Sequence, residues 1–212
     1  GQEDTLSATM DQMIYHTLAV CNGAKLSMVV LDMPCGTYTT EETALLNATR
    51  AYQETAAQAV KIEGGKERAH IVEALTKNSI AVLGHIGLMP QFLRSEGGYK
   101  IRGKDAEDIA TLVEDAKALE AAGAFAIVVE GVKPEAAKAI TDAISIPTIG
   151  IGAGNATDGQ VLVWSDMFGF FESFKPKFVK EYFDGAKQVR AGLEAYRNEV
   201  KGREFPGEEY TY

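Results

Sequence analysis

The chain has 212 residues, 46% hydrophobic and 24% charged, which is ordinary for one globular domain with a sizeable core. Its net charge of -9 argues against nucleic acid or an anionic membrane as the main partner. Two cysteines are too few for a disulfide framework and lack metal-ligand spacing, so a reduced, cytosolic compartment is expected. The N-terminal residues are neither basic nor apolar, and no run has the length of a membrane span.

Apolar periodicity and capping residues predict helices that alternate with short apolar strands. Helices are expected over residues 7–21, 39–56, 67–77, 105–122, 134–144, 176–183 and 184–200. Strands are expected over residues 27–32, 59–63, 80–85, 124–130, 146–154 and 160–166. Thr39 and Glu42 have the spacing of a capping box at the start of the second helix. Residues 88–104 show no period and are predicted to form a long loop with several basic residues, of a kind that is often functional.

The predicted strands are apolar on both faces, as parallel strands covered by helices are. Alternating strands and helices give an α/β fold, either a doubly wound sheet or a (β/α)8 TIM barrel. A glycine-rich turn at 150–154 lies late in the chain and lacks the spacing of a dinucleotide fingerprint, which argues against NAD binding.

The polar residues at strand ends favour the barrel. Four strands end in a polar or charged residue, and functional residues spread over many strand ends are typical of a barrel. These residues are Asp32, Lys61 with Glu63, His85 and Glu130. Only six strands are found and the chain begins with a helix, so the first two βα units of the barrel are expected to be absent. Residues 1–212 are predicted to form a single TIM-barrel domain with six of eight βα units and C-terminal helices from about residue 176.

The types of residue at these strand ends point to a chemistry. Asp32 and Glu63, on neighbouring strands, suit a hard divalent ion such as Mg²⁺. Lys61 offers positive charge to a substrate carboxylate or a developing enolate oxygen. Glu130 follows an apolar run, where desolvation would raise its pKa and make it a general base. Each acid alone could equally form a salt bridge at the barrel rim, but four such strand ends together favour an active site.

Several stretches of the chain resemble the ketopantoate hydroxymethyltransferase family of the phosphoenolpyruvate/pyruvate barrel superfamily. They occur in the family's order across nearly the whole chain, and the two most specific are VKIEGG and the long glycine-rich stretch. The stretches are LDMP (31–34), VKIEGG (60–65), GHIGLMPQ (84–91), GGYKIRG (97–103), ALEAAGA (118–124), GIGAGNATDGQVLV (150–163), PKF (176–178) and PGEE (206–209).

This resemblance implies transfer of a hydroxymethyl group from 5,10-methylenetetrahydrofolate to 3-methyl-2-oxobutanoate. The reaction passes through a Mg-stabilised enolate and gives ketopantoate, on the route to pantothenate and coenzyme A. By resemblance, Asp32 is a Mg²⁺ ligand that also contacts the keto acid, and Glu63 is a metal-associated carboxylate. Lys61 and His85 bind the substrate, and Glu130 accepts the proton.

The resemblance also implies a homo-oligomer, a decamer in characterised members, and the cytoplasmic location expected from the cysteine content is kept. The family has an Asp-Ser pair at the end of its second strand, which this chain does not contain. Two other hypotheses stay open at this point. The chain could be another Mg-dependent C–C lyase or mutase of the same superfamily, or an inactive barrel fragment with a structural role.

Overall fold

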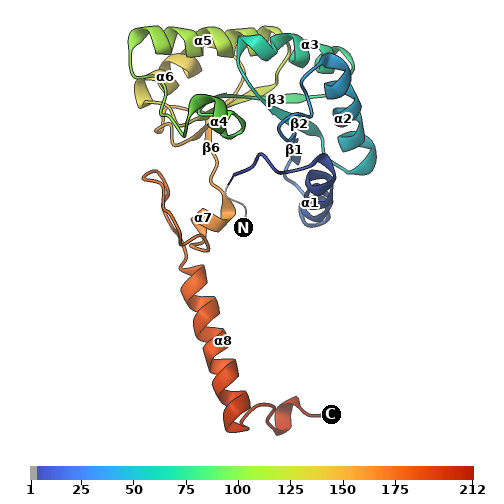
Figure 1. Ribbon diagram of the computed structural model, residues 1–212, viewed down its shortest axis with the longest axis vertical. Coiled ribbons are helices and arrows are strands. Elements are labelled where there is room, and N and C mark those ends of the chain that lie inside the picture. Colours follow the sequence, from blue (N-terminus) through green and yellow to red (C-terminus); the bar gives the residue numbers. More distant parts are fainter. Residues whose placement is uncertain (1–3) are drawn as a thin grey trace. The chain divides into compact units, whose positions relative to one another are not determined.

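Six parallel strands form one sheet in which the strand order follows the chain order (Figure 1). The computed structural model describes residues 4–212. The strands are β1 (Val30–Asp32), β2 (Ala59–Glu63), β3 (Val82–Gly87), β4 (Ala126–Glu130), β5 (Thr148–Ile151) and β6 (Gly159–Gln160). A doubly wound sheet reverses its strand order at a switch point. The sequential order therefore excludes that alternative and gives an α/β fold with a curled, parallel half-barrel.

Eight α-helices and three 3₁₀ turns are formed by the described residues. They are α1 (Met10–Gly23), α2 (Glu41–Glu54), α3 (Ala69–Lys77), α4 (Leu93–Glu96), α5 (Ala106–Ala121), α6 (Pro134–Ala143), α7 (Trp164–Met167) and α8 (Gly185–Gly202), with turns at Lys66–Arg68, Pro90–Phe92 and Glu208–Tyr210. Asp105 caps α5 as expected, by accepting a hydrogen bond from the N–H of Asp108. The capping box of α2 uses Thr40 with Thr43, one residue later than the predicted pair.

The two faces of the sheet carry different hydrophobic clusters. Because side chains alternate along a strand, residues such as Leu31, Ile62 and Ile127 point to the face covered by α2, α3, α5 and α6, where the main core lies. The opposite face carries a smaller cluster, formed by Leu83, Ala126, Val128 and Ile151. This less covered face is the one from which the polar strand ends project.

Two predicted elements near the end of the chain are wrong. The strand predicted over 160–166 stops after Gln160, the last residue paired with β5, and residues Trp164–Met167 are helical. Val161, Val163 and Trp164 are all exposed, so the apolar pattern that suggested a strand has no sheet to pack on. The helix predicted over 176–183 is absent, because that stretch contains only a turn in which Val179 N–H bonds to the Pro176 carbonyl.

The chain divides into two compact units, one ending at Val161 and one comprising Leu162–Tyr212. Within the second unit, α8 begins after Asp184 as predicted, and its apolar positions Val189, Leu193 and Tyr196 are exposed. The prediction of one domain over the whole chain stays a prediction. Among residues 4–212, no helical segment combines the length and apolar character that a membrane span needs.

Candidate active site

The strand register brings the five predicted site residues to one face of the sheet. Asp32 lies opposite Lys61 across β1 and β2, and Glu63 lies opposite His85 across β2 and β3. Glu130 is two residues beyond Val128, the register partner of His85, so it points the same way. All five side chains therefore project from the carboxyl ends of adjacent strands, where barrel enzymes place their active sites.

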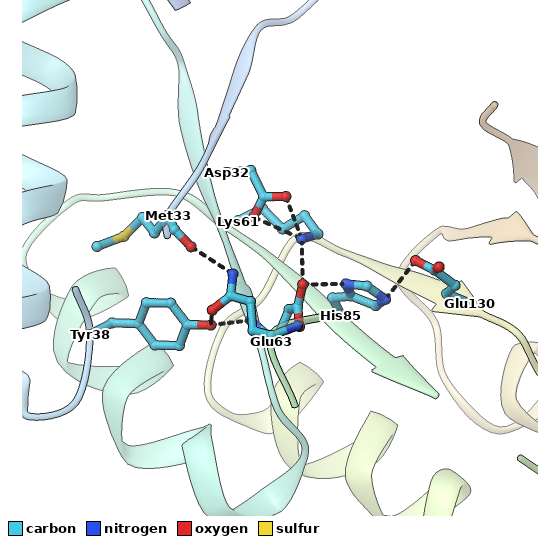
Figure 2. Close-up of polar contacts among 8 residues, drawn as sticks. Asp32, Met33, Tyr38, Lys61, Glu63, His85 and Glu130 are labelled. Atoms are coloured by element: carbon cyan, nitrogen blue, oxygen red, sulfur yellow. Dashed lines mark hydrogen bonds and ion pairs between the residues drawn. The ribbon is translucent and has the colours of Figure 1, made fainter. Parts of the chain in front are cut away.

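Lys61 is a cation held between two carboxylates (Figure 2). Its Nζ lies 2.8 and 2.7 Å from the two oxygens of Asp32, and 3.6 Å from Oε1 of Glu63. The side chains of Lys61 and Glu63 are only 13% and 3% exposed, so water does little to screen the attraction between these two groups, whereas the Asp32 side chain is 45% exposed and its pair with Lys61 is partly screened. One ammonium group thus links the ends of β1 and β2.

Glu63 is buried, and its pKa is raised because burial penalises its charged form, against the opposing effects of Lys61 and His85. Its Oε2 accepts a hydrogen bond of 2.9 Å from the backbone N–H of Gln91. Its other oxygen faces Lys61 and His85. The carboxylate therefore has one oxygen anchored to the loop after β3 and one directed into the site.

His85 lies between two carboxylates. Its Nδ1 is 3.7 Å from Oε1 of Glu63 and its Nε2 is 3.3 Å from Oε2 of Glu130. Neither ring nitrogen forms a hydrogen bond within the described part of the chain. Burial lowers its pKa to about 4, with the charge of Lys61 adding to the effect, so the ring is neutral near pH 7. A neutral imidazole has one donor and one acceptor nitrogen, so it can bond to both carboxyl groups only when one of them is protonated.

Glu130 has the properties that a general base needs. Burial raises its pKa to about 7, although Lys61 acts in the opposite direction. The group can therefore both take and release a proton near neutral pH. Its position depends on Gly87, the last residue of β3, which has a φ of 100° and where a side chain would overlap the carbonyl oxygen of Glu130.

The carboxylates at the strand ends are the type of donor that a hard divalent ion prefers. Residues 4–212 contain no cluster of three or more His, Cys, Asp or Glu side chains arranged around a metal. Mg²⁺ needs only one or two carboxylates, because water and substrate oxygens complete its shell. Asp32 and Glu63 are the two candidate carboxylates, and the Lys61 ammonium contacts both of them. A metal ion on Asp32 would compete with Lys61 for the same oxygens.

Two site residues were missed by the analysis of strand ends. The Tyr38 hydroxyl accepts a bond of 3.2 Å from the N–H of Glu63 and donates to the side-chain oxygen of Gln91. Gln91 also donates from its side chain to the Met33 carbonyl, at 2.9 Å. Tyr38 stands in an irregular stretch without any pattern. Gln91 is the last residue of the GHIGLMPQ stretch and lies in the long loop predicted over 88–104, and these two features were the only indication of its role in the site.

A pocket of about 240 Å³ opens beside these two residues. Its walls come from the segments that follow β1, β2 and β3: Cys35, Gly36, Tyr38, Thr39, Arg68, Gln91, Phe92 and Ser95. The guanidinium of Arg68 lies 5.8 Å from the centre of the Tyr38 ring. The basic residues of the 88–104 loop do not converge on this pocket, since Arg102 pairs with Asp108 and Arg94 with Asp4.

Solved structures of other proteins share the fold of this chain. 2,3-Dimethylmalate lyase, a member of the PEP mutase/isocitrate lyase superfamily, aligns with a TM-score of 0.54 and 18% identity, over 100% of this chain and 74% of that one. Phosphonopyruvate hydrolase aligns with a TM-score of 0.53 and 14% identity, over 93% of this chain and 67% of that one. At such identities the likeness concerns the fold alone, and it agrees with the curled, parallel α/β half-barrel described above.

Sequence relatives identify the family. A family model described as ketopantoate hydroxymethyltransferase matches residues 1–208. The 3-methyl-2-oxobutanoate hydroxymethyltransferase of Aliarcobacter butzleri is 61% identical over 100% of this chain and 79% of that protein. The enzyme of the same name from a Nitratiruptor species is 59% identical, over 100% of this chain and 80% of that protein. The chain belongs to the ketopantoate hydroxymethyltransferase family.

Proposed function

We propose that this protein transfers a hydroxymethyl group from 5,10-methylenetetrahydrofolate to 3-methyl-2-oxobutanoate, in a Mg²⁺-dependent reaction that gives ketopantoate for pantothenate synthesis. Family membership supports the transferase activity. The observation that carries the mechanism is the placement of Glu130, a carboxyl group with a pKa of about 7, on the same face of the sheet as the Asp32–Lys61–Glu63 cluster. A base and a site for anionic oxygens are the two requirements for enolate formation.

Each site residue has a role in this proposal. Lys61 and Asp32 bind and orient the keto acid, with Lys61 attracting its carboxylate or keto oxygen. Asp32 and Glu63 hold Mg²⁺, which when bound supplies Lewis-acid stabilisation of the negative charge that develops on the keto acid. Glu130 accepts the C3 proton while the electrons of the C3–H bond move into the enolate. His85 is neutral, its Nε2 lies 3.3 Å from Oε2 of Glu130, and its role in the proposal is to bind the substrate beside the base.

The enolate carbon then forms the new C–C bond. The one-carbon unit leaves the nitrogen atoms of the folate, and water supplies the hydroxyl oxygen of the product, so that atoms balance. C3 has no hydrogen after the new C–C bond forms, so the proton held by Glu130 passes to an oxygen or nitrogen atom of the products, ketopantoate or tetrahydrofolate, when the base is regenerated. The other lyase or mutase reactions of the superfamily receive no separate support, because the similarity to those structures concerns only the fold.

The proposed activity is tested by incubating the full-length protein with the keto acid, methylenetetrahydrofolate and Mg²⁺. We expect ketopantoate to form, formation to stop when EDTA is added, and activity to return when excess Mg²⁺ is restored. Turnover of a phosphonate or an isocitrate-like acid without ketopantoate formation would instead assign the protein to another reaction of the superfamily. If neither the keto acid nor Mg²⁺ raised the melting temperature, the proposal of an enzyme would itself be lost.

We also propose a complete barrel and an oligomeric state for this protein, as the family resemblance implies. The half-barrel would be part of an eight-stranded TIM barrel, lacking its first two βα units here, in a cytoplasmic homo-oligomer that is a decamer by resemblance. Among the described strands, β1 and β6 are the two edges of the sheet, and closing a barrel removes such edges. The exposed apolar positions of α8, among them Leu193, are of the kind that a partner subunit covers.

The stability of the protein should depend on pH through Glu130. Burial raises the pKa of this group from 4.5 to about 7, so the folded protein binds a proton more tightly than the unfolded chain does. Its contribution to the free energy of unfolding is therefore fully present below pH 4.5 and is lost as the pH rises to about 7. Between about pH 5 and about pH 8, Glu130→Gln should gain roughly 1–3 kcal/mol in stability relative to the parent protein.

Urea unfolding of both proteins at the two pH values measures this difference. Glu135→Gln, which removes an exposed carboxylate from the first turn of α6, is the matched control. An equal stability difference between parent and Glu130→Gln at both pH values would show that this carboxyl group is not desolvated as described.

A further inference from the structure

Tyr38 and Gln91 connect three strand ends of the site. Tyr38 bonds to the backbone of Glu63 at the end of β2 and to the side chain of Gln91 in the loop after β3. Gln91 bonds through its side chain to the carbonyl of Met33, the residue that follows Asp32 and β1. The two side chains therefore join the positions of Asp32 and Glu63, which lie on neighbouring strands.

The same pair determines how the Glu63 carboxylate is oriented. The terminal torsion of a glutamate has a broad energy profile, so a carboxylate turns unless hydrogen bonds hold it. Oε2 of Glu63 is held by the N–H of Gln91, which leaves Oε1 facing Lys61 and His85. The place of that N–H depends in turn on the two bonds made by the Gln91 side chain. Within the described part of the chain, neither Tyr38 nor Gln91 forms a hydrogen bond with the Lys61 ammonium or the Glu130 carboxylate.

We propose that Tyr38 and Gln91 are positioning residues that fix the separation of Asp32 and Glu63 and the orientation of the Glu63 carboxylate for Mg²⁺ binding. This inference rests on the proposed function, because it assigns the pair to the metal and substrate site. Partners of ligating carboxylates act in this way in metal sites generally, and their loss weakens metal binding about 10–100-fold.

The fold contains a matched control for a purely structural role. At the amino ends of β2 and β3, the Tyr52 hydroxyl accepts a bond of 2.9 Å from the N–H of Ala81 and donates one of 2.8 Å to the carbonyl of Gln58. Gln58 and Ala81 immediately precede β2 and β3. Tyr52 thus bridges β2 and β3 far from the carboxyl ends, with the same number of hydrogen bonds as Tyr38.

The test compares Tyr38→Phe, Gln91→Met and Tyr52→Phe in the full-length protein. Mg²⁺ affinity is measured by calorimetry, kcat and KM by ketopantoate formation, and stability by thermal unfolding. We expect Tyr38→Phe and Gln91→Met each to weaken Mg²⁺ binding about 10-fold or more and to lower kcat. Tyr52→Phe should lower the melting temperature while leaving Mg²⁺ affinity and kcat within about 2-fold of the parent values, because it acts only on strand packing.

Because Tyr38 and Gln91 are proposed to act as one unit, the double variant should lose little more Mg²⁺ affinity than the worse single variant. Parent-like Mg²⁺ affinity in Tyr38→Phe or in Gln91→Met would overturn the inference, as would an equal loss in Tyr52→Phe. The proposed function is judged separately, by whether the parent protein makes ketopantoate at all. If it does not, the Mg²⁺ affinities of the three variants still decide the inference by themselves.

Discussion

Replacing Glu130 by glutamine is expected to slow exchange of the C3 proton of 3-methyl-2-oxobutanoate with solvent by about 10²–10⁴-fold. The amide keeps the size and position of the side chain but cannot accept the proton. Mg²⁺ binding should be nearly unchanged, because Glu130 forms no ion pair with Lys61 and lies beyond His85 from Glu63. Loss of the C3 proton signal in D₂O, followed by NMR without the folate, measures this step alone.

The pH dependence of exchange supplies a second check on Glu130. Only the ionised carboxylate accepts a proton, and its pKa is about 7, so the exchange rate in the parent protein should rise with pH through that value. The residual exchange of Glu130→Gln should lack this rise. Glu135→Gln, on the exposed surface of α6, should behave as the parent does. Exchange at the parent rate in the Glu130 variant would remove this residue as the base.

Replacing Asp32 by asparagine is expected to weaken Mg²⁺ binding by at least about 10–100-fold, the loss that already follows removal of a ligand's supporting partner. Asparagine keeps one acceptor oxygen but loses the negative charge that a hard cation requires. It also removes the two-oxygen contact to Lys61, so the ammonium is left with Glu63 as its ion-pair partner among the described residues. Substrate binding should therefore change as well as metal binding. Calorimetric titration with Mg²⁺ gives the affinity.

Asp142→Asn is the appropriate comparison for that variant. Asp142 pairs with Lys138 at 2.6 Å on α6, and both side chains are well exposed, so its loss removes an aspartate–lysine pair without touching the site. Exposed pairs contribute little to stability, and no effect on Mg²⁺ is expected. If Asp32→Asn bound Mg²⁺ as tightly as Asp142→Asn, Asp32 would not be a ligand.

The strand ends were predictable because each is marked locally. A short apolar run identifies a buried strand. A charged residue at the end of such a strand has a high free-energy cost of burial unless it is paired, so its presence indicates a partner or a site. The residues Asp32, Lys61, Glu63, His85 and Glu130 carry this mark, and the parallel register brings them together. The proposed roles of these residues came from chemistry and family resemblance, and they stay predictions.

The contacts of Tyr38 and Gln91 could not be predicted in this way. These residues are 53 positions apart, and neither lies in a strand or in a regular helical pattern. Their hydrogen bonds form only once the loops after β1 and β3 have been brought together by the sheet. Local patterns also failed at residues 160–166, where an apolar sequence favours a strand but the surrounding structure offers no neighbour to complete it.

The charges at the strand ends have a consequence for the proposed reaction. With all three carboxyl groups ionised, the cluster contains three carboxylates and one ammonium group, so it carries two more negative than positive charges. A divalent cation would restore neutrality. In the proposed reaction, moving the C3 proton to Glu130 would transfer one negative charge from the protein to the substrate without changing the total. The low-dielectric site would thus meet the same net charge before and after proton abstraction, which limits the reorganisation required of its surroundings.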